Sequence, residues 1–161
     1  MESLEDKAEF LDLLLAATND GIVDWDLIEN ETHYNDRWRF LLGWDEAGFE
    51  LTPNTWRELI HEDERSVVET AITDHLTSAW PFIQVVRMRH RTLGWRWILI
   101  RGRAGMNAQG QPSRMVMLFA DIDERMRAEA QVNALIEGLP DTILSVRSDG
   151  TILAAKAGSG L

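Results

Sequence analysis

The chain contains no cysteine, and this absence excludes several kinds of chemistry. Disulfide bonds, thiolate metal sites, cysteine nucleophiles and flavin photochemistry through a cysteine adduct are all ruled out. Basic residues are also scarce, since 16 Lys and Arg stand against 27 Asp and Glu and give a formal net charge of −11. A charge of this sign disfavours nucleic acid or an anionic lipid surface as the main partner.

Long hydrophobic runs are missing as well. The longest apolar runs hold about six residues, whereas a membrane-spanning helix needs about 20. The N-terminus is acidic and lacks the basic segment with which a signal peptide begins. We therefore expect a cytoplasmic chain without direct membrane contact, either free or as the soluble part of a membrane receptor.

Tryptophan, in contrast, is abundant. The 161 residues include seven Trp, and 45% of all residues are apolar. This length suits one domain and a remainder, and the apolar share is ordinary for a globular protein. So many large side chains predict a solid core or a large interface.

The chain is organised around three consecutive antiparallel strands, predicted at 82–91, 95–103 and 113–121. Short turn sequences separate them, one at Leu93-Gly94 and one at 107–110. The middle and last strands are apolar on both faces, so both faces of the sheet need cover.

The middle strand has this two-sided pattern in its clearest form. It places Trp95, Trp97 and Leu99 on one face, and Ile98 and Ile100 on the other. One face can pack on helices of the same domain. The other must meet a terminal helix or another subunit, because it would otherwise be an exposed apolar patch.

A helix predicted at 2–19 supplies such a partner. Its apolar residues Leu4, Ala8, Leu11 and Leu15 recur at helical spacing. We therefore expect a homodimer formed through the N-terminal helix and the outer face of the sheet.

The remaining elements complete one domain and begin another. The spacing of Asp121 and Glu124 is that of a capping box, which predicts a helix from Asp121 and a hydrogen bond from the backbone N–H near Glu124 to the Asp121 side chain. The other predicted elements are a strand at 22–27, a return strand from Thr32, a short helix at 37–42 and a longer helix at 61–78. The predicted divisions are an N-terminal helix at 1–20, a folded domain at 21–122, a linker helix at 123–138 and an incomplete domain at 139–161.

An internal repeat supports the incomplete second domain. When the chain is shifted by about 121 residues, Asp20 falls on Asp141 and Ile22-Val23 falls on Ile143-Leu144. Helix, break, aspartate, apolar strand, turn and strand recur in the same order. In the second copy the strands are predicted at 142–146 and 151–155, with a turn at Ser148-Asp149-Gly150 and a flexible tail at 157–160. The repeat predicts a tandem array whose second unit is cut off at residue 161.

Several local motifs follow one another along the chain. They are Asp24-Trp25-Asp26-Leu27, Leu41-Leu42-Gly43-Trp44, Trp56-Arg57-Glu58-Leu59-Ile60-His61-Glu62-Asp63, Arg87-Met88-Arg89, Gly94-Trp95-Arg96-Trp97-Ile98 with Arg101-Gly102, and Asp121-Ile122-Asp123-Glu124-Arg125. In this order and spacing they resemble the PAS family, in its bacterial sensor subgroup with a PAC-type C-terminal motif. The resemblance covers residues 11–125, and residues 131–155 resemble the opening of a second PAS domain. Asp123 departs from the pattern, because the family usually has Thr there.

The resemblance implies an α+β fold, with a five-stranded antiparallel sheet, flanking short helices, an N-terminal helix and a C-terminal linker helix. PAS domains are sensory and dimerisation modules upstream of histidine kinases, diguanylate cyclases or phosphodiesterases, in two-component or cyclic-di-GMP signalling. We expect a conformational signal to pass through Asp121, Ile122 and Asp123 into the linker helix and on to an effector domain in the same chain. The alternative is a ligand-free PAS scaffold that only mediates protein–protein interaction.

In PAS domains a small-molecule pocket lies between the inner sheet face and the helices. The residues that the resemblance assigns to its lining are Trp25, Phe40, Leu41, Trp56, Leu59, Ile72, Leu76, Trp97 and Met117. Because large side chains interdigitate without voids, we favour a filled or small cavity and expect Trp25 and Trp97 to be buried. No cofactor is expected, with haem through His75 as a less favoured alternative and no LOV-type flavin because there is no Cys.

No catalytic or metal site is predicted. The four His lack metal-ligand spacing, and the acidic residues show no pair tied to a cleft. The arginines between Arg87 and Arg103 interleave with Trp95 and Trp97, a composition that can mark single-stranded nucleic acid. We interpret them as solvent-facing residues that pair with acids of the chain, and expect no nucleic-acid partner.

Overall fold

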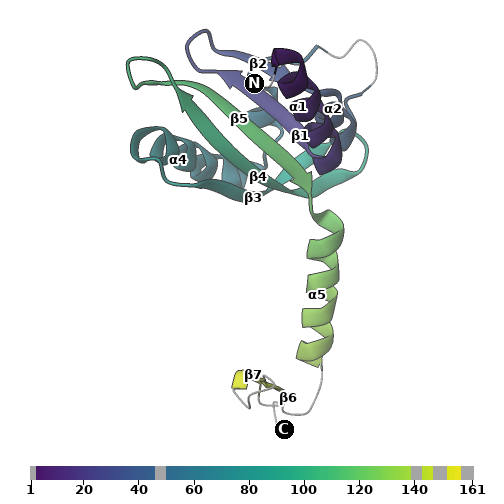
Figure 1. Cartoon of the computed structure of the whole chain (residues 1–161). Coiled ribbons are helices and arrows are strands. Elements are labelled where there is room, and N and C mark those ends of the chain that lie inside the picture. Colours follow the sequence, from purple (N-terminus) through teal and green to yellow (C-terminus); the bar gives the residue numbers. More distant parts are fainter. Residues whose placement is uncertain (1–2, 46–49, 139–142, 147–151, 157–161) are drawn as a thin grey trace. The chain divides into compact units, whose positions relative to one another are not determined.

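The computed structural model describes residues 3–45, 50–138, 143–146 and 152–156. The chain divides into two compact units, Met1–Asp123 and Glu124–Leu161, and each is described by itself (Figure 1). None of the helices among these residues is both long and apolar enough to cross a membrane.

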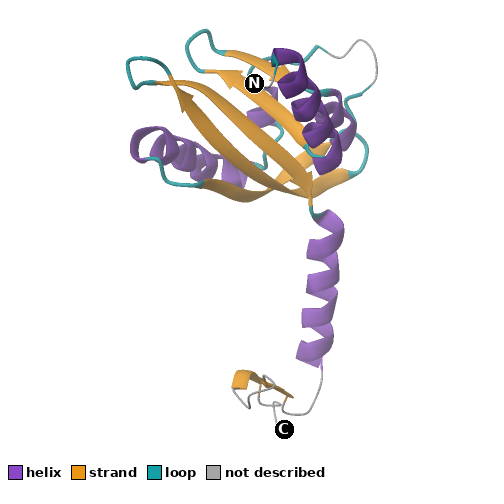
Figure 2. Cartoon of the chain, in the orientation of Figure 1, coloured by secondary structure: helices purple, strands orange, loops and turns teal. Residues whose placement is uncertain are grey.

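The first unit is built on a five-stranded antiparallel sheet with the strand order β2-β1-β5-β4-β3 (Figure 2). The strands are β1 (Gly21–Asp26), β2 (Glu31–Tyr34), β3 (Phe82–His90), β4 (Gly94–Met106) and β5 (Pro112–Asp121). The three long strands confirm the predicted meander, with β4 paired to β3 on one side and to β5 on the other. Strand β1 pairs with β2, the next strand in the sequence, on one side and with β5, which is distant in the sequence, on the other.

Among the described residues, four helices accompany this sheet, namely α1 (Leu4–Thr18), α2 (Asp36–Leu41), α3 (Thr55–Glu58) and α4 (Glu62–Ser78). Local capping explains where α1 and α2 begin. Ser3 and Asp6 form a reciprocal capping box at the start of α1. The Asn35 side chain accepts from the backbone N–H groups of Trp38 and Ile22, both at 2.8 Å, and so ties the start of α2 to β1. Gly21 allows this close approach, because a Cβ there would lie 2.8 Å from the Trp38 Cα.

The hydrophobic core lies between one face of the sheet, called the inner face below, and helices α2, α3 and α4. Its buried members are Val23, Trp38, Leu41, Leu42, Trp56, Ile60, Val68, Ile72, Phe82, Val86, Met88, Ile98, Ile100, Met115, Met117 and Phe119. Alternation along the strands selects them, since every second residue of β4 and β5 points to the same face. The core therefore draws on both halves of the first unit.

The opposite, outer face of the sheet is also apolar but remains open in this chain. Ile83 and Val85 are 55% and 45% exposed, and Val116 is 39% exposed. None of the residues of α1, all of which the structure describes, is buried. Both surfaces that were predicted to need cover are thus accessible in a single copy.

The second unit contains α5 (Asp123–Gly138) from its second residue onward, together with β6 (Ile143–Val146) and β7 (Ile152–Lys156). Strands β6 and β7 pair antiparallel and correspond to the strand pair predicted at 142–146 and 151–155. The turn predicted at Ser148-Asp149-Gly150 and the tail at 157–160 lie outside the described residues.

Candidate functional site

The structure brings most of the predicted pocket residues together in the core. Leu41, Trp56, Ile72 and Met117 are buried there, and Trp25, Leu59 and Leu76 are partly buried and pack against the same cluster. The rings of Trp25 and Trp56 lie 6.5 Å apart, centroid to centroid. These residues form a packed cluster under the inner face of the sheet.

Two of the predicted residues lie elsewhere. Trp97 is on the outer face, because Ile98 and Ile100 take the inner positions of β4, and it is only partly buried. The Arg87 guanidinium lies 5.7 Å from its ring centroid. The expectation that Trp97 lines the pocket and is a core residue therefore needs correction. Phe40 also needs correction, since its side chain is 59% exposed on the solvent side of α2.

Trp38 belongs to the core and escaped the sequence-based prediction. Trp38 and Trp56 are both 0% exposed, and each meets the Phe119 ring edge-on at 6.2 Å. The indole Nε1–H groups of these two tryptophans have no hydrogen-bond partner among the described residues. Because a buried donor without an acceptor costs free energy, these two groups are the places where a water or a polar ligand atom would gain most.

Tyr34 fastens α3 to the edge of the sheet beside this core. Its hydroxyl donates to the Thr52 carbonyl at 2.9 Å and accepts from the Trp56 backbone N–H at 3.2 Å. Burial raises the pKa of Tyr34 to about 12, against weaker lowering by the hydrogen bond from Trp56 and by the Arg57 charge. The phenol is therefore neutral and structural at physiological pH.

His75, on the last turns of α4, has both ring nitrogens engaged. Nε2 accepts from the Ala104 backbone N–H at 3.0 Å, which leaves the proton of the neutral ring on Nδ1 for donation to the Trp80 carbonyl. An axial bond to haem iron would have to displace the Ala104 N–H, so the residues present do not fit that cofactor. No group of three or more His, Asp or Glu in the described part of the chain could hold a metal ion.

The predicted relay residues form a hydrogen-bonded junction where β5 ends and α5 begins. Asp121 Oδ2 accepts from Arg96 Nη2 at 2.8 Å, and Asp121 Oδ1 accepts from the Asp123 backbone N–H at 2.9 Å. The capping bond thus comes from Asp123, close to the predicted donor at Glu124. The Ile122 N–H donates to the Trp97 carbonyl at 2.9 Å.

Asp123 is the most buried charged residue of this junction, at 1% exposure. Its Oδ1 accepts from the Trp97 backbone N–H at 3.1 Å, and its Oδ2 lies 3.5 Å from Arg96 Nη1. The start of β4 therefore holds the end of β5 through one arginine and two carboxylates. Sequence reasoning did not identify Arg96, although the antiparallel pairing of the two strands could have suggested it.

Two further arginines, one in the basic run and one beyond it, also meet carboxylates of this chain. Arg87 Nε donates to Glu64 Oε1 at 2.7 Å, and Arg114 pairs with Asp24 across the outer face. These pairs agree with the interpretation of the run as solvent-facing residues that the chain's own acids partly neutralise.

Comparison with known proteins supports the architecture described above. A family model described as PAS fold matches residues 31–118. A solved structure of a sensory box histidine kinase/response regulator from Burkholderia thailandensis is 26% identical, with a TM-score of 0.64 over 79% of this chain and 95% of that chain. The N-terminal domain of a diguanylate cyclase with a PAS/PAC sensor from Marinobacter aquaeolei has a TM-score of 0.58 at 14% identity, over 66% of this chain and 98% of that one.

A curated relative is the peroxide stress-activated histidine kinase mak3 of Schizosaccharomyces pombe, which is 30% identical over 90 residues. The match covers 54% of this chain but only 4% of that much longer protein.

Proposed function

Because the chain belongs to the PAS fold family, we propose that it is a sensory and dimerisation module of a larger bacterial signalling protein. The output domain would be a histidine kinase or a diguanylate cyclase or phosphodiesterase. The observation that carries this proposal is the likeness to nearly the whole of a solved chain from a sensory box histidine kinase. The similarity to a domain from a diguanylate cyclase supports the fold. It keeps a diguanylate cyclase as the alternative output domain in this proposal.

The junction at Asp121 offers a physical route for the signal. Strand β5 contributes Met115, Met117 and Phe119 to the core, and the same strand ends at Asp121. A change in the core that shifted β5 would alter the geometry of the bonds to Arg96 and Asp123. Each of these hydrogen bonds contributes only a small free energy, but a typical coupling free energy between two sites is itself only about 1–3 kcal/mol. In this proposal the helix that starts at Asp123 carries the change to the effector.

The alternative function is a ligand-free scaffold that works only as an interaction unit. The dense packing around Trp38 and Trp56 favours it, whereas their unpartnered indole N–H groups favour a ligand with an acceptor atom. Native mass spectrometry of the freshly purified protein distinguishes the two. A bound small molecule that leaves on denaturation supports the sensor with a ligand, and a bare protein mass supports the scaffold.

We also propose that residues 139–161 begin a second PAS domain and that the 121–125 segment is a PAC-type exit motif. The shared order of helix, break, aspartate and strand supports the repeat. A longer protein that carries this chain would then hold sensor domains in tandem, with the effector in the same chain.

Dimerisation is the part of this proposal that a single variant can test. Leu4, Leu11 and Leu14 of α1 are 88%, 52% and 48% exposed, and the outer face of the sheet is apolar and open. Together such surfaces can bury roughly 1,600 Å² in total, the size of a standard interface. We expect a homodimer at tens of micromolar protein that Leu11→Glu converts largely to monomer, measured by multi-angle light scattering.

The control for this variant is Leu93→Glu, which makes the same change at an exposed leucine in the β3–β4 turn. It should leave the dimer intact, and both variants should keep the far-ultraviolet circular dichroism of the parent chain. A parent chain that is monomeric at this concentration contradicts the proposed dimer.

A further inference from the structure

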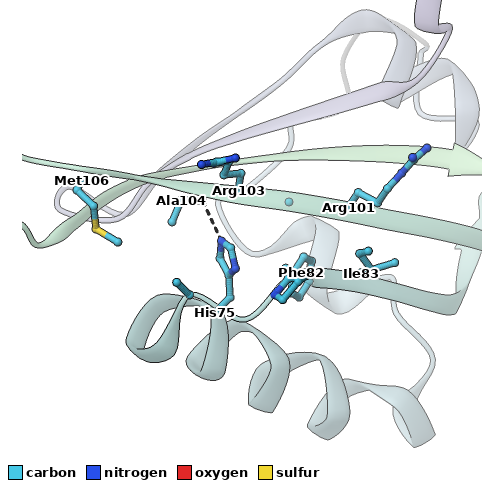
Figure 3. A pocket seen from close by; sticks show the side chains of 10 residues that line it. His75, Phe82, Ile83, Arg101, Arg103, Ala104 and Met106 are labelled. Atoms are coloured by element: carbon cyan, nitrogen blue, oxygen red, sulfur yellow. Dashed lines mark hydrogen bonds between the residues drawn. The ribbon is translucent and has the colours of Figure 1, made fainter.

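A hollow of about 550 Å³ lies at the end of α4, at the rim of the core and away from the junction at Asp121 (Figure 3). Strand lengths explain why it exists. Strand β3 begins at Phe82, which pairs with Gly102, whereas β4 continues to Met106 and is paired there only with β5. The last part of β4 therefore has an edge without a strand beside it. The chain between α4 and β3 does not pair with this edge. Ala79 ends α4 in the left-handed conformation, and Pro81 follows just before β3 begins.

His75 occupies part of the free edge and fixes one wall of the hollow. Its Nε2 accepts the Ala104 N–H that a neighbouring strand would otherwise bind, and its other ring nitrogen contacts the Trp80 carbonyl. The imidazole is therefore held from two sides, and Figure 3 shows the bond to Ala104. Because both of its nitrogens are used, a ligand in the hollow has to be recognised by other groups.

Two arginines supply the charge of the hollow, and no carboxylate lines it. This is unusual in a chain with a formal net charge of −11. Arg87, Arg96 and Arg114 each pair with an acid of the chain. Arg103, in contrast, has no hydrogen bond or ion pair among the described residues, and Arg101 has only an electrostatic attraction to Asp20.

Arg101 and Arg103 lie on the same face of β4, since they are two residues apart and alternate residues of a strand share a face. Their Cα atoms are then about 6.6 Å apart. In Figure 3 the two guanidinium groups point away from each other, so both long side chains have to rotate to meet on one small anion. The planar guanidinium fork matches the two oxygens of a carboxylate.

The rest of the hollow is apolar and partly open. Phe82 forms a buried part of the lining, and Ile83 and Met106 are 55% and 52% exposed beside it. The volume falls in the range of about 300–1,000 Å³ that is typical of small-molecule sites. An occupant that fits both parts has an apolar body and one anionic group.

We propose that this hollow is a second, peripheral binding site for a small apolar carboxylate. The carboxylate lies between Arg101 and Arg103, and the apolar body covers Met106 and Ile83 at the open edge of β4. The site is separate from the packed core around Trp38 and Trp56, where a ligand of the proposed sensor function would bind, so each proposal can fail without the other.

The test uses naphthalene-2-carboxylate as the probe and its neutral analogue naphthalene-2-carboxamide as the control ligand. Both are titrated into the ¹⁵N-labelled full chain and followed by two-dimensional NMR. We expect the carboxylate to shift the amide signals of Gly102, Ala104 and Met106 in particular. The carboxamide should bind at least about tenfold more weakly, because it cannot form the charge-assisted bonds.

The Arg101→Gln/Arg103→Gln double variant should weaken carboxylate binding by about tenfold or more and leave the binding of the carboxamide unchanged. Arg89→Gln is the matched control, because Arg89 is an exposed residue of β3 that does not line the hollow. It should bind the carboxylate like the parent chain. Shifts centred on another part of the domain, equal binding of the two probes, equal effects of the double and control variants, or no binding would each overturn the proposal.

Discussion

Replacing Trp38 with alanine is expected to lower the free energy of unfolding by about 3–5 kcal/mol, the usual cost of truncating a fully buried aromatic side chain. Trp38 is 0% exposed and touches two other aromatic rings, those of Tyr34 at 4.4 Å and Phe119 at 6.2 Å. The truncation leaves a cavity between α2 and the sheet that Gly21 cannot fill. Urea unfolding followed by circular dichroism measures the loss.

Trp80→Ala is the matched control for this variant. The Trp80 side chain is 68% exposed, and its contact with His75 uses the backbone carbonyl, which alanine retains. Its effect should stay within about 0.5 kcal/mol. Equal losses for Trp38→Ala and Trp80→Ala would show that Trp38 is not the centre of the core described above.

Asp123→Ala is expected to cost about 2–3 kcal/mol, because it removes a buried charged acceptor. The variant leaves the Trp97 backbone N–H without the carboxylate 3.1 Å away and deprives Arg96 of one of its two acidic partners. The loss is smaller than for Trp38 because Arg96 is still paired with Asp121. Chemical unfolding followed by tryptophan fluorescence reports on this unit, since all seven Trp precede residue 123.

Asp123→Asn separates the two contributions at this position. It keeps an oxygen for the Trp97 N–H and removes the charge that faces Arg96, so its cost should lie between zero and that of Asp123→Ala. An Asp123→Ala variant as stable as the parent chain would contradict the conclusion that the buried Asp123 carboxylate stabilises the junction after β5.

Hydrophobic alternation and turn residues were enough to predict the three consecutive long strands, whereas the five-stranded sheet was inferred from the family resemblance. The strands predicted at 82–91 and 113–121 end within one residue of β3 and β5, because Gly and Asn bound them and their apolar residues alternate. Alternation could not decide which face of β4 is inside, since both faces are apolar. The helices decided it by packing on Ile98 and Ile100, and this placed Trp97 on the outer face.

Which residues meet at the candidate sites is determined more by the register of the strands than by residue type. Trp56 was predicted from a family motif, whereas Trp38 was missed although it follows the Asn35 cap by three residues. The pairing of Arg96 with Asp121 follows from the register between β4 and β5. The hollow beside Arg103 follows from where β3 begins and where β4 ends. A one-residue difference in register moves every side chain to the other face, so a sequence pattern alone cannot fix such contacts.

In the longer signalling protein proposed above, the effector activity tests the proposed relay through Asp121 most directly. Asp121→Ala removes an exposed cap and ion pair that together contribute about 1 kcal/mol, so the melting temperature should fall by only a few degrees. Asp24→Ala, which breaks the exposed pair with Arg114 away from the junction, is the control. If the junction carries the signal, Asp121→Ala changes basal or stimulated output by about fivefold or more, and Asp24→Ala does not. Output at the parental level in both states of the Asp121→Ala protein would mean that the junction is a passive tether.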